Sequence, residues 1–260
     1  MNLRGKTVVV TGASSGIGRA TALEMARRGA NLILGARRLS ELEETAVACR
    51  ALGVNALAVV TDVTKRDDCA RLIAAAAQVD VLVNNAGYAV YNSIADADVD
   101  DLRALMDTNY FGAVHCTKAV LPQMLARGEG SIVNVSSITG IMGFARMGGY
   151  YATKFALIGF TEALRNEVMP DGLRVALVCP GTTQTEFFVK AEYEKMPGAA
   201  RLIAGLRPER VARAICDAAE DGRYRRILPW SSAMYMRMKE IFPRFSHLLM
   251  RRVSALLERW

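Results

Sequence analysis

Residues 6–28 read KTVVVTGASSGIGRATALEMARR, in which a short apolar run is followed by a glycine-rich turn and a helix-like pattern. The β-branched side chains of the run predict a buried strand. Glycines at 12, 16 and 18 allow a tight turn and close approach of backbone N–H groups to a ligand. Because a helix begins at this turn, its positive end would face a pyrophosphate. Glycines also occur in loops for structural reasons alone, so the turn gains meaning from its place after the first strand.

Six further apolar runs follow the first, and each but the last precedes a helix-like segment. Both faces of most of these runs are apolar, which is typical of a parallel sheet covered on both sides and joined by right-handed crossovers. The sequence therefore predicts an α/β fold of one domain, a doubly wound parallel sheet of the Rossmann type. Ligands of such sheets bind beyond the carboxyl ends of the strands. The runs occupy 31–37, 55–63, 79–87, 131–137, 173–181 and 225–230, and the loops of interest begin at Thr11, Arg37, Asp62, Asn84, Ser136 and Pro180.

Composition limits the class of protein. Of the 260 residues 52% are hydrophobic and 23% are charged, and no apolar run reaches the length of a membrane span, so a disordered or membrane-spanning chain is disfavoured. The five cysteines and two histidines are scattered, so we expect buried reduced thiols and no metal site. The amino end has no secretory pattern, and we expect a cytoplasmic protein. The net charge of +7 is concentrated in residues 223–260, which hold nine Arg or Lys against two Glu.

The spacing of the first turn is TGxxxGxG, and at this point the chain resembles the short-chain dehydrogenase/reductase family. Three later segments at strand ends agree with that family, namely TDVT at 61–64, NNAG at 84–87 and PGTTQT at 180–185. Each alone could be an ordinary turn, but they occur together and in order. The implied cofactor contacts are Gly12, Ser14, Ser15, Gly16, Ile17 and Gly18 at the pyrophosphate, Asp62 and Val63 at adenine, Asn84, Ala86 and Gly87 along the cofactor, and Pro180, Gly181, Thr183 and Thr185 at the carboxamide.

The choice between NADPH and NADH depends on the end of the second strand. An acidic residue there accepts a hydrogen bond from the ribose 2′-hydroxyl, whereas arginine accommodates a 2′-phosphate. The sequence reads GARR, so Arg37, with Arg38 or Arg19 assisting, predicts NADP(H) in preference to NAD(H). Two arginines could also simply begin an exposed loop, in which case an NAD-dependent alcohol dehydrogenase is the alternative.

Residues 148–160 read GGYYATKFALIGF and contain two adjacent tyrosines. Side chains four residues apart share a helix face, so Tyr150 should meet Lys154, while Tyr151 should turn with Phe155 toward packing. A tyrosine hydroxyl has a pKa of about 10 and can be tuned by nearby positive charge. The spacing YxxxK also occurs in ordinary amphipathic helices. Ser137, thirteen residues before Tyr150 at a strand end, and Asn109 in DTNYFG complete the family's set of four catalytic residues.

The resemblance implies a reaction as well as a site. Hydride would pass between the nicotinamide C4 and a carbonyl carbon, with Tyr150 as general acid, or as base in the reverse direction. Ser137 would orient the substrate oxygen, Asn109 would support proton resupply, and Lys154 would bind the nicotinamide ribose and lower the pKa of Tyr150, so that both residues also contact the cofactor. Two other classes are an NADP-binding scaffold or regulatory protein without turnover and a methyltransferase on a related sheet, which would not need Tyr150, Lys154 and Ser137 together.

Two apolar segments should line the substrate side, 139–149 and a loop at about 186–207. Their composition favours a lipophilic or aromatic ketone or aldehyde, or the corresponding alcohol, although a lid packed on itself would have the same composition. The apolar side chains are Met142, Phe144, Met147, Phe187, Phe188, Tyr193 and Met196.

The resemblance covers about residues 5–222, so we expect an NAD(P)-binding domain over 1–230 and a basic amphipathic helical extension over 231–260. In the extension, Leu249, Val253, Leu256 and Trp260 share a helix face with Phe245, and Arg244, Arg251, Arg252 and Arg259 fall on the other. This helix could dock on its own or a partner subunit, or attach peripherally to anionic lipid through 234–260. Nucleic acid is not expected, since no binding motif accompanies the basic residues. The resemblance implies a homodimer through helices near 98–126 and 150–168 and leaves a tetramer in doubt.

Overall fold

The computed structural model describes residues 1–143, 145–185 and 205–242, together with Arg244, Ser246, Leu248 and Arg252. Seven parallel strands form a single sheet in the order β3-β2-β1-β4-β5-β6-β7. All seven predicted strands are present, and the predicted doubly wound parallel sheet is confirmed. The strands are β1 Thr7–Thr11, β2 Asn31–Ala36, β3 Ala56–Val60, β4 Val81–Asn84, β5 Ser131–Val135, β6 Arg174–Pro180 and β7 Arg225–Leu228.

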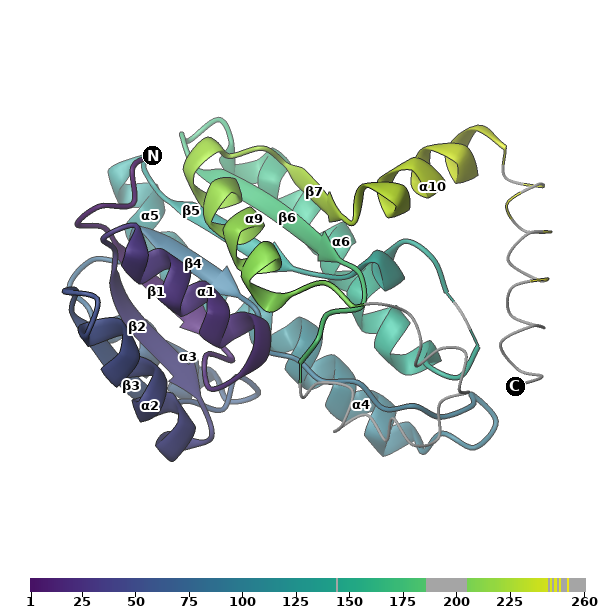
Figure 1. Cartoon of the computed structure of the whole chain (residues 1–260), viewed down its shortest axis with the longest axis horizontal. Coiled ribbons are helices and arrows are strands. Elements are labelled where there is room, and N and C mark those ends of the chain that lie inside the picture. Colours follow the sequence, from purple (N-terminus) through teal and green to yellow (C-terminus); the bar gives the residue numbers. More distant parts are fainter. Residues whose placement is uncertain are drawn as a thin grey trace.

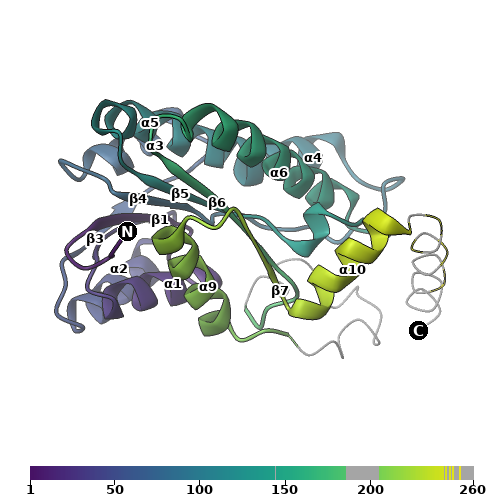
Figure 2. The same ribbon diagram turned by 90° about the horizontal axis from the view of Figure 1, so that it is seen from above.

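Helices cover both faces of the sheet, as Figures 1 and 2 show. One face carries α1 Gly16–Arg27, α2 Leu39–Arg50 and α9 Pro208–Asp221. The other carries α3 Arg66–Ala74, α4 Val99–Met106, α5 Gly112–Arg127 and α6 Gly148–Val168. The π-helical turn η1, Asp107–Phe111, joins α4 to α5, and the short 3₁₀ helix η2, Ile138–Gly140, follows β5. The last helix, α10 Trp230–Ile241, extends beyond β7 at the end of the sheet.

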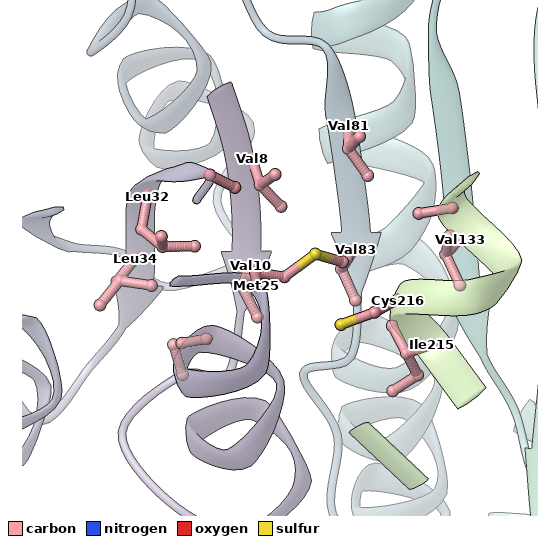
Figure 3. Close-up of a cluster of buried hydrophobic side chains, with 14 of the residues drawn as sticks. Val8, Val10, Met25, Leu32, Leu34, Val81, Val83, Val133, Ile215 and Cys216 are labelled. Carbon is pink, nitrogen blue, oxygen red and sulfur yellow. The ribbon is translucent and has the colours of Figure 1, made fainter. Parts of the chain in front are cut away.

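Alternate residues of each central strand enter opposite cores, because successive side chains of a strand point to opposite faces. Val8 and Val10 pack with Met25 of α1 and Ile215 of α9 (Figure 3). Val9, between them, belongs to the second core, which is built with side chains of α3, α5 and α6. Since both sets are buried, the central strands need apolar residues at every position, which is the pattern that the sequence shows.

The strand order places the ligand crevice. β1 pairs with β2 on one side and with β4 on the other, so the chain leaves β1 in one direction and returns after β3 to continue in the other. The loops that follow β1 and β4 therefore separate at the carboxyl edge of the sheet, which is where doubly wound folds bind ligands. Thr11 and Asn84, the last residues of these two strands, lie at that edge.

The C-terminal extension is described only in part, and the predicted domain boundary near residue 230 stays a prediction. Helix α10 begins at Trp230, and Arg244, Ser246, Leu248 and Arg252 are also helical. Among the residues that the structure describes, no helix is both long and apolar enough to cross a bilayer. The residues of the predicted tail faces and substrate segments that lie outside the described residues are Phe144, Phe187, Phe188, Tyr193, Met196, Phe245, Leu249, Arg251, Val253, Leu256, Arg259 and Trp260.

Candidate active site

The four predicted catalytic residues come from three elements and gather at the carboxyl edge of the sheet. Ser137 follows β5, Asn109 lies in η1, and Tyr150 and Lys154 lie one turn apart on α6. Their exposed fractions are 1% for Asn109, 7% for Ser137, 7% for Tyr150 and 4% for Lys154. Buried polar side chains in proteins normally have hydrogen-bond partners or a function.

Ser137 connects the tyrosine to two loops. Its Oγ donates a hydrogen bond to the carbonyl of Pro180, 3.3 Å away, and accepts one from the backbone N–H of Thr139 at 3.1 Å. Burial raises the pKa of Tyr150 to about 12, while the neighbouring hydroxyls of Ser137 and Thr139 act in the opposite direction. Thr139 was not among the predicted site residues. Its position two residues after Ser137, in a segment that starts with a serine cap, is the signal that could have indicated it.

The pair Tyr150 and Lys154 meets as predicted from the helix spacing. The Nζ atom of Lys154 lies 5.6 Å from the centre of the Tyr150 ring and donates to the carbonyl of Val135 at 3.1 Å. Burial raises the pKa of Tyr150, and the expected lowering of this pKa by Lys154 together with a bound nicotinamide stays a prediction. The lysine is desolvated in the same way, which lowers its own pKa to about 8.

Tyr151 has the packing role predicted for it, but with other neighbours. Its side chain is 8% exposed and clusters with Ala89, Tyr91 and Met147. Phe155, the expected packing partner, is 46% exposed on the outer side of α6. The loop after β4 therefore covers Tyr151.

Asn109 is held by the π turn η1, in which one extra residue per turn changes the direction of the side chains. Its Nδ2 donates to the carbonyl of Tyr88 at 2.8 Å and to Oγ1 of Thr153 at 3.1 Å, and its Oδ1 accepts from the Tyr88 N–H at 2.9 Å. A Cβ atom on Gly87 would lie 2.9 Å from Asn109 Oδ1 and 3.6 Å from Lys154 Nζ. Gly87 thus leaves room for both polar groups to face the same small space.

The glycine-rich turn packs against the loops after β4 and β6. A Cβ on Gly18 would lie 2.2 Å from the carbonyl oxygen of Gly12, so only glycine fits there. Gly12 has φ of +67°, and a Cβ on it would meet the Ala86 Cα at 2.9 Å. A Cβ on Gly16 would touch the Thr185 side chain at 3.2 Å. Three of the predicted cofactor-binding segments therefore converge at this turn.

Asn85, the first residue after β4, is a further polar residue beside this turn, and the sequence did not indicate it. Its Nδ2 donates to the carbonyl of Thr11 at 2.9 Å, and its backbone N–H donates to the Thr11 Oγ1 at 3.0 Å. These bonds fasten the end of β1 to the loop after β4. The doubled asparagine of NNAG was the available signal, but it did not say which of the two faces the turn.

The side chain of Asn84 points into the protein. It is 4% exposed, and its Nδ2 donates to Asn134 Oδ1 at 2.9 Å and to Thr117 Oγ1 at 3.1 Å. It therefore joins β4 to β5 and α5 inside the protein, and the expectation that Asn84 lies against the cofactor stays a prediction. The side chain takes this direction because a buried amide needs polar partners, which the neighbouring strand and helix provide.

The arginines after β2 flank the glycine-rich turn. Arg38 donates to Ser15 Oγ at 2.8 Å and to Ser14 Oγ at 3.2 Å, and it also pairs with Glu41 at 2.9 Å. Arg37 is exposed and has no hydrogen bond or ion pair with any residue in the described ranges. Arg19, which was expected to assist, is exposed on α1.

These features fit a bound dinucleotide phosphate. Ser15 is the N-cap of α1 but its side chain makes no capping bond, so the first-turn N–H groups are available to an anion. The turn allows close approach, because Gly12 and Gly18 have no side chains, and the guanidinium of Arg38 supplies positive charge beside it.

The predicted adenine contacts are partly engaged within the protein. The carboxylate of Asp62 accepts from the N–H and hydroxyl of Thr64, at 3.1 and 2.8 Å. Val63 is 7% exposed and packs against Gly112, where a Cβ would lie 2.6 Å from its Cγ2. Both residues follow the end of β3, at the same edge of the sheet as the glycine-rich turn.

The loop after β6 is held in place by backbone pairing. The N–H of Gln184 donates to the carbonyl of Leu206 at 2.9 Å, and the N–H of Leu206 donates to that of Thr182 at 2.7 Å. Thr183 is 4% exposed, and its hydroxyl donates to the carbonyl of Gly181 at 2.9 Å. This pairing places Thr185 beside the glycine-rich turn.

On the substrate side, a hydrogen bond joins two segments whose contact the sequence did not indicate. Lys239 of α10 donates from Nζ to the carbonyl of Ile141 at 2.7 Å, across 98 residues of sequence. Met142 and Met147, two of the predicted apolar lining residues, are each 7% exposed in the same loop. The contact brings the C-terminal helix to the loop that starts at Ser137.

The five cysteines are free and buried, as the sequence predicted. Cys69 of α3 and Cys116 of α5 are close enough for a hydrogen bond between their thiols, although 47 residues apart in sequence. Over the described residues, no three His, Cys, Asp or Glu side chains gather as a metal ion would require.

Comparison with known proteins agrees with this arrangement. The sequence model of a family described as short chain dehydrogenase matches residues 6–195. The chain is 37% identical over 223 residues to an NADP-dependent 3-hydroxy acid dehydrogenase of Schizosaccharomyces pombe, covering 82% of this chain and 86% of that protein. It is 40% identical over 220 residues to glycine betaine reductase ATRR of Emericella nidulans, covering 82% of this chain but only 17% of that much longer protein.

Two solved structures share the fold. A short chain dehydrogenase/reductase of Burkholderia phymatum in complex with NAD superposes with a TM-score of 0.83 and 27% identity, covering 92% of this chain and 94% of that one. A short-chain dehydrogenase of Sphingobium yanoikuyae in complex with NADPH gives a TM-score of 0.79 and 28% identity, with 91% and 94% covered. The two relatives carry different cofactors, so fold similarity alone does not choose between them.

Proposed function

Because the chain belongs to the short-chain dehydrogenase family, whose members are oxidoreductases acting on small molecules with NAD(P), we propose that it is an NADPH-dependent enzyme that interconverts a carbonyl compound and its alcohol. The observation that carries the proposal is the convergence of Ser137, Tyr150 and Lys154 at the sheet edge where the glycine-rich turn lies. A scaffold without turnover would have no use for a buried lysine beside a buried tyrosine.

In this proposal the bound nicotinamide supplies or accepts the hydride, and the residues of the chain handle the oxygen and its proton. In reduction, the Tyr150 hydroxyl donates its proton to the substrate oxygen as the carbonyl carbon becomes an alcohol carbon. Its raised pKa of about 12 keeps that proton in place at neutral pH. Ser137, whose hydroxyl lies beside Tyr150, would rotate its one hydroxyl proton from the Pro180 carbonyl to the same substrate oxygen and orient it.

Lys154 and Asn109 have supporting roles. The ammonium of Lys154 binds the ribose hydroxyls of the cofactor and faces the tyrosine ring. Asn109 holds the loop at Tyr88 by two hydrogen bonds and so fixes one wall of the space beside Gly87 and the lysine. Through that space a proton lost by Tyr150 can be replaced.

The proposed preference for NADPH rests on the residues after β2. Strand β2 ends at Ala36, so no carboxylate stands where a ribose 2′-hydroxyl would be accepted. Arg37 is exposed and has no hydrogen bond or ion pair with any residue that the structure describes, and Arg38 donates hydrogen bonds to Ser14 and Ser15. A 2′-phosphate placed there would receive charge-assisted hydrogen bonds. The relatives include an NADP-dependent enzyme and a structure with NADPH, which is compatible with this preference.

The test is a fluorescence titration with NADPH and with NADH on the wild type, Arg37→Ala, Arg38→Ala and the double variant. We expect NADPH to bind at least about tenfold more tightly, with most of the difference lost in the double variant, because each charge-assisted bond contributes about 1.5–3 kcal/mol. Arg103→Ala, an exposed arginine of α4, is the matched control. If NADPH and NADH bind equally well and none of the three variants changes their affinities, the preference is contradicted and an NAD-dependent alcohol dehydrogenase is favoured.

We propose a lipophilic or aromatic ketone or aldehyde as substrate. Ala89, Tyr91, Met147 and Tyr151 form a buried cluster with Tyr150, so the described surroundings of the tyrosine are apolar and aromatic. Such surroundings favour apolar carbonyl compounds over sugars. Turnover of aryl ketones with no turnover of aldoses would agree with this, and the reverse would contradict it.

We also propose a homodimer through the outer faces of α5 and α6. Phe111 at the end of η1, Leu125 of α5 and Phe155 of α6 are 42%, 41% and 46% exposed, and large exposed apolar side chains can mark an interface. Light scattering of the wild type and Phe155→Glu tests this, with a monomer expected only for the variant. A wild-type monomer would contradict it.

A further inference from the structure

Helix α10 has two different faces. Trp230, Met234 and Ile241 are 71%, 51% and 68% exposed, and their spacing of four and eleven residues puts them on one side of the helix. Arg237, seven residues after Trp230, is exposed on the same side. Met236, on another side, is 5% exposed and packs onto the protein. The helix thus has a buried side and an outer side that is largely apolar.

The buried side is tied to the catalytic domain. The hydrogen bond from Lys239 to the carbonyl of Ile141 joins α10 to the loop after Ser137. Figures 1 and 2 both place α10 past β7, at the end of the sheet and away from α1, α2 and α3. The outer side is therefore held in a defined direction and is not covered by the helix layers of the fold.

The apolar side chains continue past the helix. Phe242 is 60% exposed and Leu248 is 52% exposed, and Arg244 and Arg252 are exposed in the same segment. We use the term C-terminal surface for Trp230, Met234, Arg237, Ile241, Phe242 and Arg244. Single exposed apolar residues are normal on proteins, but several large ones within a few turns indicate a surface that binds something.

The charge of this segment distinguishes between two binding partners for the C-terminal surface, a second copy of the chain and an anionic lipid surface. Residues 223–260 hold nine Arg or Lys and two Glu. Arg237 stands within the apolar stripe, so a second copy placed face to face would bring arginines together, which is unfavourable without acidic partners. A negatively charged surface with an apolar layer beneath it would complement both the basic charge and the exposed apolar side chains.

We propose that the C-terminal surface docks on a bilayer that contains anionic phospholipid. Tryptophan is enriched at the level of the lipid headgroups, where Trp230 would lie, and basic side chains are attracted to anionic lipid. A helix of this kind lies in the plane of the interface with its apolar side in the headgroup and acyl boundary. The domain would then remain outside the bilayer, with α10 against it.

The proposal does not depend on the oxidoreductase activity, but it has a consequence for it. Since α10 holds the loop after Ser137 through Ile141, docking would bring that loop to the membrane surface. An apolar substrate dissolved in the bilayer would then be close to the catalytic residues, which agrees with the substrate class proposed above.

The experiment is co-sedimentation of the full chain with vesicles of phosphatidylcholine alone and of phosphatidylcholine mixed equally with phosphatidylglycerol. We expect binding to the mixed vesicles, at least tenfold weaker binding to phosphatidylcholine alone, and loss of binding at high salt. Trp230→Ser together with Ile241→Ser should reduce binding at least tenfold, and Arg237→Glu should reduce it and its salt dependence. NADPH binding, measured on each variant, shows that the variants are folded.

Two matched controls lie elsewhere on the surface. Met169→Ser changes a side chain that is 55% exposed at the end of α6, and Arg103→Glu changes an arginine that is 72% exposed on α4. Both should bind the mixed vesicles like the wild type. Absence of vesicle binding, or equal loss in the controls, would overturn the proposal. Self-association that Trp230→Ser and Arg237→Glu abolish, without vesicle binding, would also overturn it and assign the surface to a second copy of the chain.

Discussion

The Nζ atom of Lys154 lies 5.6 Å from the centre of the Tyr150 ring, and the two side chains are 4% and 7% exposed. Burial affects the two groups in opposite directions, because it disfavours the charged form of each. It raises the pKa of Tyr150 to about 12 and lowers that of Lys154 to about 8. Burial therefore keeps the hydroxyl of Tyr150 protonated at neutral pH, as a proton donor requires.

The burial of Lys154 leads to a prediction about how stability depends on pH. The pKa of Lys154 is about 8 in the folded protein and near 10.5 in the unfolded chain. Between pH 8 and pH 10.5 this lysine therefore holds its proton in the unfolded chain but not in the folded protein. The contribution of Lys154 to the free energy of unfolding should then rise with pH across this window, against the fall contributed by buried thiols such as Cys179, whose pKa burial raises. In Lys154→Met that rise should be absent, which urea denaturation at several pH values without cofactor would measure. The exposed Lys118→Met is the control and should retain it. Parallel curves for Lys154→Met and the wild type would contradict the burial of a titrating lysine.

Gly18 makes a prediction about the cofactor. Alanine at this position would place its Cβ 2.2 Å from the Gly12 carbonyl, which forces the turn to open and costs about 1–3 kcal/mol. We expect Gly18→Ala to weaken NADPH binding at least about tenfold and to lower the melting temperature. Gly159→Ala is the control, because a Cβ there meets no atom within 4 Å. Unchanged NADPH affinity in Gly18→Ala would show that the turn does not approach the cofactor.

Lys239 makes a prediction about the substrate side. Lys239→Met removes the hydrogen bond to Ile141, so the loop after Ser137 should become less ordered. We expect the KM for the carbonyl substrate to rise several-fold with NADPH affinity unchanged, and Lys239→Arg to restore most of the wild-type value. A fall in kcat at constant KM would instead indicate that Lys239 takes part in the chemistry, and no change in either would show that the contact does not position the loop.

Periodicity in the sequence sufficed for the sheet and for the choice of tyrosine. Strands such as 8–10 are apolar on both faces, which only a sheet covered on both sides explains, and the structure has all seven. The spacing of four that joins Tyr150 to Lys154 is a local property of a helix, so it required no knowledge of the rest of the chain.

What the sequence could not provide depends on contacts between distant segments. Lys239 and Ile141 are 98 residues apart, and no local pattern joins them. The direction of Asn84 depends on Asn134 and Thr117, which supply its partners. The raised pKa of Tyr150 depends on how completely packing excludes water from its hydroxyl, which no motif expresses.

The central claim is that Tyr150 is the proton donor for hydride transfer from NADPH. The most direct measurement is the oxidation of NADPH by wild type, Tyr150→Phe and Tyr151→Phe with an aromatic ketone that the wild type reduces. We predict that Tyr150→Phe loses about 10²–10⁴-fold in kcat, the usual share of a general acid, while it binds NADPH with wild-type affinity. Tyr151→Phe, which removes a hydroxyl from the adjacent packing residue, should retain most of the activity. Comparable rates for Tyr150→Phe and the wild type would contradict the account.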